Sequence, residues 1–422
     1  MTAPRTLPPQ PWMTDAAARA VVAALTAEGA EVRFVGGCVR NALLGLPTAD
    51  IDLATPDPPE TVVRLLEAAG LKAVPTGIAH GTVTAVADHK PFEVTTLRLD
   101  VETDGRRAVV AFTDDWEADA ARRDLTMNAL SCRPDGTLFD PFGGAEDLAA
   151  GRVRFVGDPR ARIGEDYLRL LRFFRFQAHY GRLPPDPAIL AIAEEMAPGL
   201  KRLSGERVRD ELLKTLRAGD PIAVLEIMIA RGILDVILPE EGGTAVLAAL
   251  LEVEPEARPP DALLRLGALL RPETDAAEDV ALRLRLSKAE RGRLVLLAAA
   301  EEQLRQAAVP FEQDRKDGAR ALRRLLYRLG AEPVADILRL GWARRAAAGQ
   351  GPARAVLERA LAEAAAWQPR HFPLTGQDLL DLGLAPGPEV GALLQRLEHW
   401  WIDEDFAPSR DDCLRKAKAL AD

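Results

Sequence analysis

Residues 32–53 contain the pattern that most restricts how this chain can fold: an apolar run, a glycine pair, a segment with helical spacing and two nearby aspartates. The run Val32–Val35 predicts a strand, and Gly36 and Gly37 allow the backbone to turn tightly and to approach a ligand closely. Residues 39–44 follow as a helix whose first N–H groups would face an anion such as a polyphosphate. The pattern therefore predicts an α/β unit with a phosphate-binding turn.

The two aspartates belong to a second predicted strand, Asp50-Ile51-Asp52. Because side chains alternate along a strand, Asp50 and Asp52 would share one face while Ile51 points to the other. Paired carboxylates bind hard divalent cations, and two such ions could serve an attacking and a leaving oxygen together. Each motif alone is common at turns and strand ends, but their combination indicates nucleotidyl transfer. Neither the G-x-G-x-x-G pattern of dinucleotide-binding folds nor the G-K-[ST] of a P-loop is present at this turn.

This order of motifs resembles the nucleotidyltransferase superfamily, and in particular the class II CCA-adding tRNA nucleotidyltransferases and bacterial poly(A) polymerases. Further segments within residues 30–217 carry the resemblance: Phe92–Arg98, Arg122–Ala129, Asp140–Gly144, Arg154–Gly157 and Glu165–Phe176. The resemblance implies that Phe92–Arg98 supplies a third carboxylate, Glu93. It also implies that the Arg-Arg-Asp-Leu-Thr-Met-Asn-Ala motif at 122–129 contacts the ribose and phosphates of a nucleotide.

The site residues follow from the same resemblance. It implies three catalytic residues, Asp50, Asp52 and Glu93, of which the two aspartates hold magnesium ions. It implies a larger set that binds the nucleotide: Gly36, Gly37, Arg40, Arg123, Asp124, Asn128, Asp166, Arg169, Arg172 and Arg175. The residue after Arg40 departs from the family pattern, because this chain has Asn41 where aspartate is common. An ionic contact is therefore not expected there, although an amide can still hydrogen-bond.

The segment Glu165–Phe176 predicts a helix that selects the nucleotide. Asp166, Arg169, Arg172 and Arg175 recur at three-residue steps and would form one polar ridge, which on most helices is only a solvated face. Here phenylalanines and leucines fill the remaining surface, so the helix is expected to be buried and its arginines to need partners. The resemblance implies that Asp166 and Arg169 read the Watson–Crick edge of the base. A carboxylate accepts from the exocyclic amine of cytosine or adenine but would face a carbonyl of uracil or guanine, which selects CTP and ATP.

Residues 99–116 lie between Glu93 and the arginine pair and lack an apolar period. They predict a mobile polar loop, and an ordinary surface hairpin is the alternative. The resemblance implies a flexible loop that is needed to switch from CTP to ATP and is shortened in enzymes that add only CC. Its presence favours addition of the complete CCA sequence.

Composition indicates a folded, soluble protein, since 48% of the 422 residues are hydrophobic. The most apolar stretch, residues 222–238, is interrupted by charged residues, so no membrane span is predicted. Three widely spaced cysteines suit a reducing cytoplasm, and none of the five histidines has zinc-ligand spacing to them. No obligate protein partner is evident.

The formal charge of −10 is unusual for a protein that binds RNA. Residues 1–140 contain 13 basic and 20 acidic residues, whereas residues 141–220 contain 14 and 12. The basic excess therefore lies around the predicted selecting helix, which favours a local positive groove. Phosphate contacts there would suit an enzyme that accepts every tRNA by shape.

The periodicity of the chain changes near residue 140. Before it, strand patterns at residues 82–87, 92–95 and 109–112 alternate with helical stretches such as 60–69, which predicts a small mixed sheet with helices. Beyond it, strand patterns nearly vanish. The sequence therefore predicts an α/β nucleotidyltransferase head (1–140), a helical neck (141–217), a helical body (218–330) and a helical, tRNA-binding tail (331–422). In the tail, Thr375 and Gly383 predict the start and end of one helix of a helical hairpin, and Trp400 and Trp401 are expected to be buried.

The expected activity is template-independent addition of CCA to tRNA from CTP and ATP, with magnesium ions and release of pyrophosphate. The alternatives are a poly(A) polymerase or a partial CC- or A-adding enzyme of the same family. A catalytically silent RNA-binding protein on the same scaffold is a third alternative, against which Asp50, Asp52 and Glu93 argue.

Overall fold

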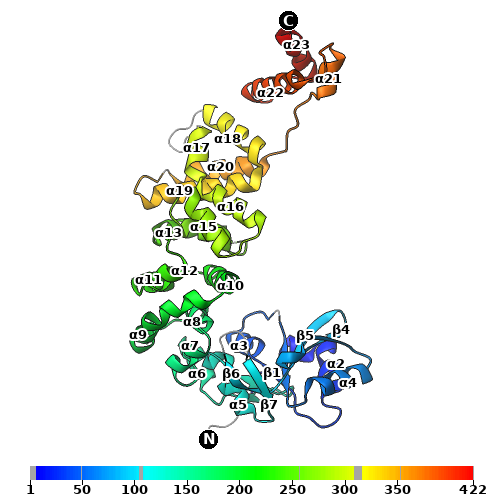
Figure 1. The fold of residues 1–422 in the computed structure, drawn as a ribbon, viewed down its shortest axis with the longest axis vertical. Coiled ribbons are helices and arrows are strands. Elements are labelled where there is room, and N and C mark those ends of the chain that lie inside the picture. The colour runs from blue at the N-terminus through cyan, green and yellow to red at the C-terminus, as the bar shows by residue number, and fades with distance from the viewer. Residues whose placement is uncertain are drawn as a thin grey trace. The chain divides into compact units, whose positions relative to one another are not determined.

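The computed structural model describes residues 6–48, 50–103, 108–255, 257–307, 316–351 and 353–421. The chain divides into two compact units, Met1–Pro239 and Glu240–Asp422. Figure 1 shows that the strands lie in the first unit and that the second is built of helices. The finer boundaries at residues 140, 217 and 330 remain predictions.

A mixed seven-stranded sheet forms the centre of the first unit, as predicted. Its strand order is β3 (Lys72–Gly77), β4 (Thr82–Ala87), β5 (Lys90–Thr96), β2 (Asp52–Thr55), β1 (Arg33–Val35), β8 (Ser131–Cys132) and β9 (Leu138–Phe139). Strands β2 and β5 are parallel, and the other pairs are antiparallel. The parallel register places Asp52 beside Glu93.

One face of the sheet is covered by helices α2 (Ala16–Leu25) and α4 (Pro59–Ala68), which contact β4 (Figure 1). The alternation of β4 explains this packing, because Val83, Ala85 and Ala87 are buried while the intervening residues are partly exposed. Strand β5 alternates in the same way, with Phe92 and Val94 in the core and Glu93 exposed. The carboxylate of Glu93 is thus on the face that the helices leave open.

The segment predicted as a loop at residues 99–116 is largely the alternative, a hairpin. Strands β6 (Arg98–Thr103) and β7 (Ala108–Phe112) pair antiparallel, followed by helix α5 (Trp116–Ala121). Strand β7 coincides with the strand pattern predicted at residues 109–112, and residues 98–103 alternate polar and apolar residues as a strand does, although the charges at 98, 100 and 102 favoured a loop. Residues 104–107 lie outside the described part.

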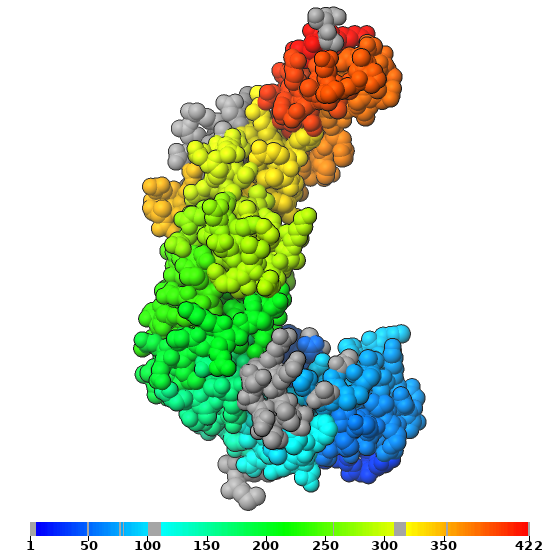
Figure 2. Space-filling model, in the orientation of Figure 1, coloured from blue at the N-terminus to red at the C-terminus, as the bar shows by residue number. Residues whose placement is uncertain are grey.

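Helices make up the remainder of the first unit. Accompanying the sheet are α1 (Pro11–Thr14), α3 (Gly37–Leu44) and the 3₁₀ turns η1 (Ile78–His80) and η2 (Thr126–Asn128). After the sheet come α6 (Gly144–Ala150), α7 (Pro159–Glu165), α8 (Leu168–Tyr180), α9 (Pro187–Met196), η3 (Ala197–Arg202), α10 (Gly205–Leu216), α11 (Ile222–Ala230) and α12 (Ile233–Ile237). Figure 2 shows the surface of these later helices in green, next to the blue and cyan surface of the sheet region.

The described part of the second unit is helical, as predicted. Its helices are α13 (Ala245–Leu251), α14 (Ala262–Leu269), α15 (Thr274–Arg283), α16 (Lys288–Ala298), α17 (Ala300–Gln306), α18 (Lys316–Leu329), α19 (Ala331–Ala347), α20 (Arg354–Ala366), α21 (Gly376–Asp381), α22 (Pro388–Asp403) and α23 (Arg410–Ala421).

The predicted ends of the tail helix are confirmed. Thr375 is the N-cap of α21, and Asp378 Oδ2 accepts hydrogen bonds from its backbone N–H at 2.6 Å and its hydroxyl at 2.9 Å. Gly383, just past the helix, has φ of 97°. Trp401 is buried against Tyr327 and other aromatic rings, as expected, whereas Trp400 is only partly buried.

Candidate active site

The glycine turn connects β1 to α3 and needs glycine at its first position. Gly36 has φ of 69°, a conformation that residues with a Cβ rarely adopt. A Cβ there would also lie 3.3 Å from Arg123 Nη1. The turn therefore lets a guanidinium approach the backbone at the N-terminal end of α3, where N–H groups are oriented toward an anion.

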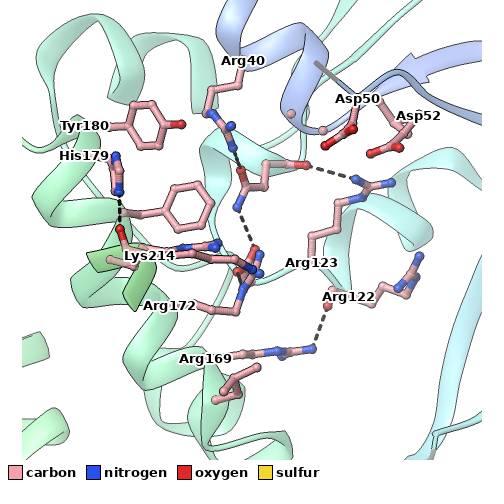
Figure 3. Close-up of a pocket in the computed structure, with 18 of the residues that line it drawn as sticks. Arg40, Asp50, Asp52, Arg122, Arg123, Arg169, Arg172, His179, Tyr180 and Lys214 are labelled. Atoms are coloured by element: carbon pink, nitrogen blue, oxygen red, sulfur yellow. Dashed lines mark hydrogen bonds and ion pairs between the residues drawn. The ribbon is translucent and has the colours of Figure 1, made fainter. Parts of the chain in front are cut away.

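The predicted carboxylates lie at the start of β2 and on its neighbour β5. Strand β2 begins at Asp52, so Asp50 precedes the strand and is not part of it, contrary to the prediction. The expected juxtaposition nevertheless holds, because Figure 3 shows the Asp50 and Asp52 carboxylates side by side. Asp52 is also in register with Glu93. Burial, the charge of Glu93 and, to a lesser extent, that of Asp50 raise the pKa of Asp52 to about 6, and Arg123 only partly offsets them.

This concentration of negative charge fits a divalent cation, which would relieve the repulsion among the carboxylates. Within the described ranges, no group of three or more His, Cys, Asp or Glu side chains is arranged to hold a metal ion by itself. An ion at Asp50 and Asp52 would therefore take further oxygen ligands from water or substrate phosphates, as Mg²⁺ commonly does in such sites.

A chain of hydrogen bonds joins Arg40 to the helix α8. Arg40 Nη1 donates to Asn128 Oδ1 at 2.7 Å, and Asn128 Nδ2 donates to Asp124 Oδ1 at 3.0 Å. The other oxygen of Asp124 accepts from Arg172 Nε at 2.5 Å (Figure 3). Burial alone would raise the pKa of Asp124, but Arg172 and the hydrogen bonds to the carboxylate lower it. The chain therefore keeps a buried carboxylate ionised between three elements far apart in sequence.

Arg40 is held from two further directions. Its guanidinium lies over the rings of Tyr180, at 4.7 Å, and Phe176, at 5.1 Å. Asn41 Oδ1 accepts from Arg40 Nε at 3.2 Å and Nη2 at 3.0 Å, while Asn41 Nδ2 donates to the Pro47 carbonyl at 3.1 Å. Asn41 thus orients Arg40 through an uncharged acceptor, where an aspartate would add a charge.

The predicted selecting helix is interrupted at its start, which corrects the expected boundary. Helix α7 ends at Glu165 and α8 begins at Leu168, because Asp166 between them is extended, with φ of −155°. Asp166 Oδ1 accepts from the Leu168 backbone N–H at 3.0 Å and so satisfies an N–H group at the start of α8. Its Oδ2 accepts from Arg207 Nη2 at 2.6 Å. Asp166 is therefore fixed at a helix junction instead of projecting from a regular turn.

The arginines of α8 have carboxylate partners, as their burial requires. Arg169 pairs with Glu165 and donates from Nη2 to the Arg122 carbonyl at 3.0 Å. Arg175 pairs with Glu211 at 3.1 Å. The opposite side of the helix is buried as predicted, since Phe173 and Phe174 are fully inaccessible.

All thirteen predicted site residues line one cavity of about 930 Å³ in the first unit. The cavity is also lined by residues that were not predicted: Val35, Thr95, Arg98, Arg122, Leu168, Phe176, His179, Tyr180, Lys214 and Arg217. Its wall holds nine arginines and lysines but five aspartates and glutamates. The acidic residues are either grouped near Asp52 or paired with arginine. The part of the cavity wall away from Asp52 is therefore positively charged and suits a polyanion.

The cations missed by the sequence interpretation include Lys214 and Arg217 at the end of α10. Earlier in the same helix, Arg209 donates to Asp210 at 2.9 Å, and neither of these two residues lines the cavity. His179 Nε2 lies 2.8 Å from the Lys214 carbonyl and links α8 to α10 (Figure 3). The three-residue spacing of Lys214 and Arg217, which places both on one face of a helix, is the sequence feature that could have indicated them.

Comparison with known proteins identifies the family. The model of the poly A polymerase head domain matches residues 32–154, and that of a probable RNA- and SrmB-binding site of polymerase A matches residues 183–241. The mitochondrial CCA tRNA nucleotidyltransferase 1 of Danio rerio is 35% identical over 403 residues, which span 91% of this chain and 86% of that protein. The chain belongs to the family of CCA tRNA nucleotidyltransferases.

Other members of this family are similar over comparable lengths. The human mitochondrial CCA tRNA nucleotidyltransferase 1 is 34% identical, with 93% of this chain and 87% of that protein covered. The CCA-adding enzyme of Streptococcus sanguinis is 31% identical, with 91% and 92% covered. The similarity to this family thus extends over more than nine-tenths of the chain.

Solved structures confirm the fold. The Bacillus stearothermophilus CCA-adding enzyme in complex with CTP aligns with a TM-score of 0.72 at 24% identity and covers 98% of each chain. The Thermotoga maritima CCA-adding enzyme complexed with tRNA aligns with a TM-score of 0.68 at 18% identity over the full length of both. Every helix in the described part of the chain is too short or too polar to cross a membrane.

Proposed function

We propose that this chain adds the sequence CCA to the 3′ end of tRNA, using CTP and ATP without a nucleic acid template. One observation carries the proposal: a single cavity is lined by the glycine turn, by Asp50, Asp52 and Glu93, and by the pair Asp166 and Arg169. Phosphate-binding, metal-binding and base-reading groups are thus within reach of one nucleoside triphosphate.

The catalytic step proposed here is in-line attack of the tRNA 3′-hydroxyl on the α-phosphate, with pyrophosphate leaving. Asp50 and Asp52 would hold Mg²⁺, which lowers the pKa of the hydroxyl and neutralises developing charge when bound. Glu93 adds a third acidic group to that end of the site. The turn at Gly36 and Gly37, together with Arg40 and Arg123, binds the triphosphate and orients the α-phosphate.

Base selection is proposed for Asp166 and Arg169. Asp166 is anchored by Leu168 N–H and Arg207, so its remaining lone pairs have a fixed direction. A fixed acceptor can take a hydrogen bond from the amine of cytosine or adenine, whereas a carbonyl of uracil or guanine would leave two acceptors facing each other. That mismatch costs about 1–3 kcal/mol, enough to prefer CTP and ATP.

The division of labour along the chain is part of the proposal. The head (1–140) supplies the catalytic carboxylates, the neck (141–217) selects the nucleotide, and the body and tail bind tRNA. CCA-adding enzymes of the same fold form complexes with CTP and with tRNA, the two ligands that this assignment requires. A cytoplasmic location is proposed because all three cysteines are free and buried, which requires no oxidising compartment.

One assay tests the proposal. Transfer RNA lacking its terminal CCA is incubated with Mg²⁺ and labelled CTP and ATP, separately and together. Addition of two residues with CTP alone, three with both, and then a stop supports CCA addition. Long adenylate tails would support the poly(A) polymerase alternative, and addition of only C or only A would support a partial enzyme. Retained tRNA binding with no incorporation of nucleotides would indicate a catalytically silent RNA-binding protein. Removal of Mg²⁺ with a chelator tests the metal requirement, because incorporation should then be lost.

A further inference from the structure

Asp119 is outside the cavity wall, but its carboxylate holds two arginines that line the cavity. It lies on α5 and is only 4% exposed. Oδ1 accepts from Arg122 Nε at 2.8 Å, and Oδ2 accepts from Arg123 Nη2 at 3.3 Å. Burial alone would raise the pKa of Asp119, but the two guanidiniums lower it, so the carboxylate is ionised at neutral pH.

The same carboxylate fixes the start of the β6–β7 hairpin. Oδ1 of Asp119 accepts a third hydrogen bond, from the backbone N–H of Arg98 at 3.2 Å. Arg98 is the first residue of β6, and its side chain also lines the cavity. One buried group therefore joins the base of the hairpin to the arginine pair, which no short sequence motif reveals.

Arg122 and Arg123 contact different parts of the proposed nucleotide site. Arg123 donates from Nη1 to the Asn128 carbonyl at 3.2 Å and lies close to Gly36, and its charge lowers the pKa of Asp52. Arg123 is thus between the glycine turn and the catalytic carboxylates. The carbonyl of Arg122, in contrast, accepts the hydrogen bond from Arg169 on α8.

We propose that Asp119 is a positioning residue that places Arg123 on the phosphate side of the nucleotide and the Arg122 backbone against Arg169. This inference rests on the proposed function, because it assumes that the cavity binds a nucleoside triphosphate. Asp119 itself contacts no substrate. It acts by holding cations that would otherwise repel each other and adopt several rotamers.

The test is the substitution Asp119→Asn, which keeps the shape of the side chain and removes its charge. We expect the Kd for CTP, measured by equilibrium titration without tRNA, to rise about tenfold, as loss of a charge-assisted contact predicts. The KM for CTP should rise by a similar factor, with a smaller change in kcat. Asp119→Glu, which restores the charge, should bind CTP within about threefold of the wild type and serves as the second variant if Asp119→Asn does not fold.

The matched control is Asp115→Asn on the same helix, since Asp115 caps α5 through the N–H groups of Glu117 and Ala118 and does not line the cavity. It should leave the Kd for CTP unchanged and change the Tm little, because asparagine caps a helix about as well as aspartate does. Equal Kd values for Asp119→Asn and the control would overturn the inference.

A double-mutant cycle separates positioning from simple stabilisation. Because Asp119 acts through Arg123 and through the Arg122 backbone, adding Asp119→Asn to Arg123→Ala should raise the Kd for CTP by less than about threefold, compared with about tenfold in the wild type. Multiplicative effects of the two substitutions would contradict the inference. Because binding is measured without tRNA, a wild type that binds CTP but fails to extend tRNA would overturn the proposed function and leave this test valid.

Discussion

Arginines are used differently in the two units of this chain. In the first unit, Arg40 and Arg172 make defined contacts but also border the cavity, so part of each guanidinium faces the space where a ligand would bind. In the second unit, Arg265 is 3% exposed and engages Glu254 through two parallel hydrogen bonds, at 2.9 and 2.6 Å. Arg293 likewise bridges Asp261, at 2.5 Å, and Asp336, at 2.6 Å.

This difference predicts that substituting an arginine in the first unit mainly lowers activity, whereas substituting a buried arginine in the second unit mainly lowers stability. A guanidinium whose donors are all taken by carboxylates contributes to folding, and removing it leaves a buried charge. A guanidinium held in place with donors to spare can bind phosphate or a base edge. Substitutions in the two units should therefore separate these effects.

The largest expected effect is on activity, for Asp52→Ala. Loss of a metal-binding carboxylate should lower kcat about 1,000-fold or more. The Tm should stay constant or rise, because the pKa of Asp52 shows that its ionised form is disfavoured in the fold. The control is Asp57→Ala, beyond β2 and outside the cavity wall, which should retain activity. Comparable kcat values for the two variants would refute the assignment.

The next largest effect is on stability, for Arg265→Ala in the second unit. Removal of one partner of a buried ion pair costs about 3–5 kcal/mol, which urea denaturation would measure. The kcat of the folded fraction should be unchanged. Arg354→Ala is the matched control, because Arg354 and Glu358 form an exposed pair with 60% and 61% accessible side chains. It should leave the free energy of unfolding unchanged. An equal decrease in the free energy of unfolding of both variants would contradict the stabilising role assigned to the buried pair.

A smaller effect is expected on selectivity, for Asp166→Ala. The ratio of kcat/KM for CTP to that for UTP should fall about tenfold. This factor corresponds to the free energy lost when the Asp166 carboxylate faces the carbonyl of uracil. Activity with CTP should fall less than selectivity. Asp158→Ala removes the cap of the preceding helix α7 and controls for local destabilisation. Unchanged selectivity in Asp166→Ala would rule out its base-reading role.

The smallest effect concerns pH. Asp52 must be ionised to bind a cation, and with a pKa of about 6 it becomes protonated as the pH falls below that value. Mg²⁺ affinity, measured by calorimetry, should therefore be nearly constant from pH 8 to 7 and fall about tenfold by pH 5. Constant affinity down to pH 5 would contradict a pKa of Asp52 that burial and the neighbouring carboxylates raise.

Local sequence patterns predicted the parts of the site that lie close together in the chain. The glycine turn needed only the conformational freedom of glycine. The proximity of Asp50 and Asp52 was predicted from their spacing, although strand alternation is not its cause, because Asp50 precedes β2. The contact of Arg40 with Asn128 spans 88 residues and depends on tertiary packing, so spacing could not reveal it. Asp119 was missed because its three donors come from two elements, and one of them is a backbone N–H.

The fold shows the same limit. Strand patterns in the sequence identified β4, β5 and β7, but the charged residues of β6 favoured a mobile loop over the hairpin that β6 and β7 form. The break between α7 and α8 was overlooked because the three-residue steps of the arginines suggested one continuous helix. Asp166 instead lies just before the N-cap Tyr167, and its carboxylate accepts a hydrogen bond from the first N–H of α8.

The junction at Asp166 has a consequence for engineering nucleotide preference. The carboxylate proposed to read the base also accepts a hydrogen bond from the first N–H of α8, so a substitution that changes specificity also changes this bond. Asparagine, serine or threonine could accept the same bond, but each offers the base a different pattern of donors and acceptors. Variants with altered base choice should thus be sought as pairs, with a compensating change at Arg207 on α10 or in the first turn of α8.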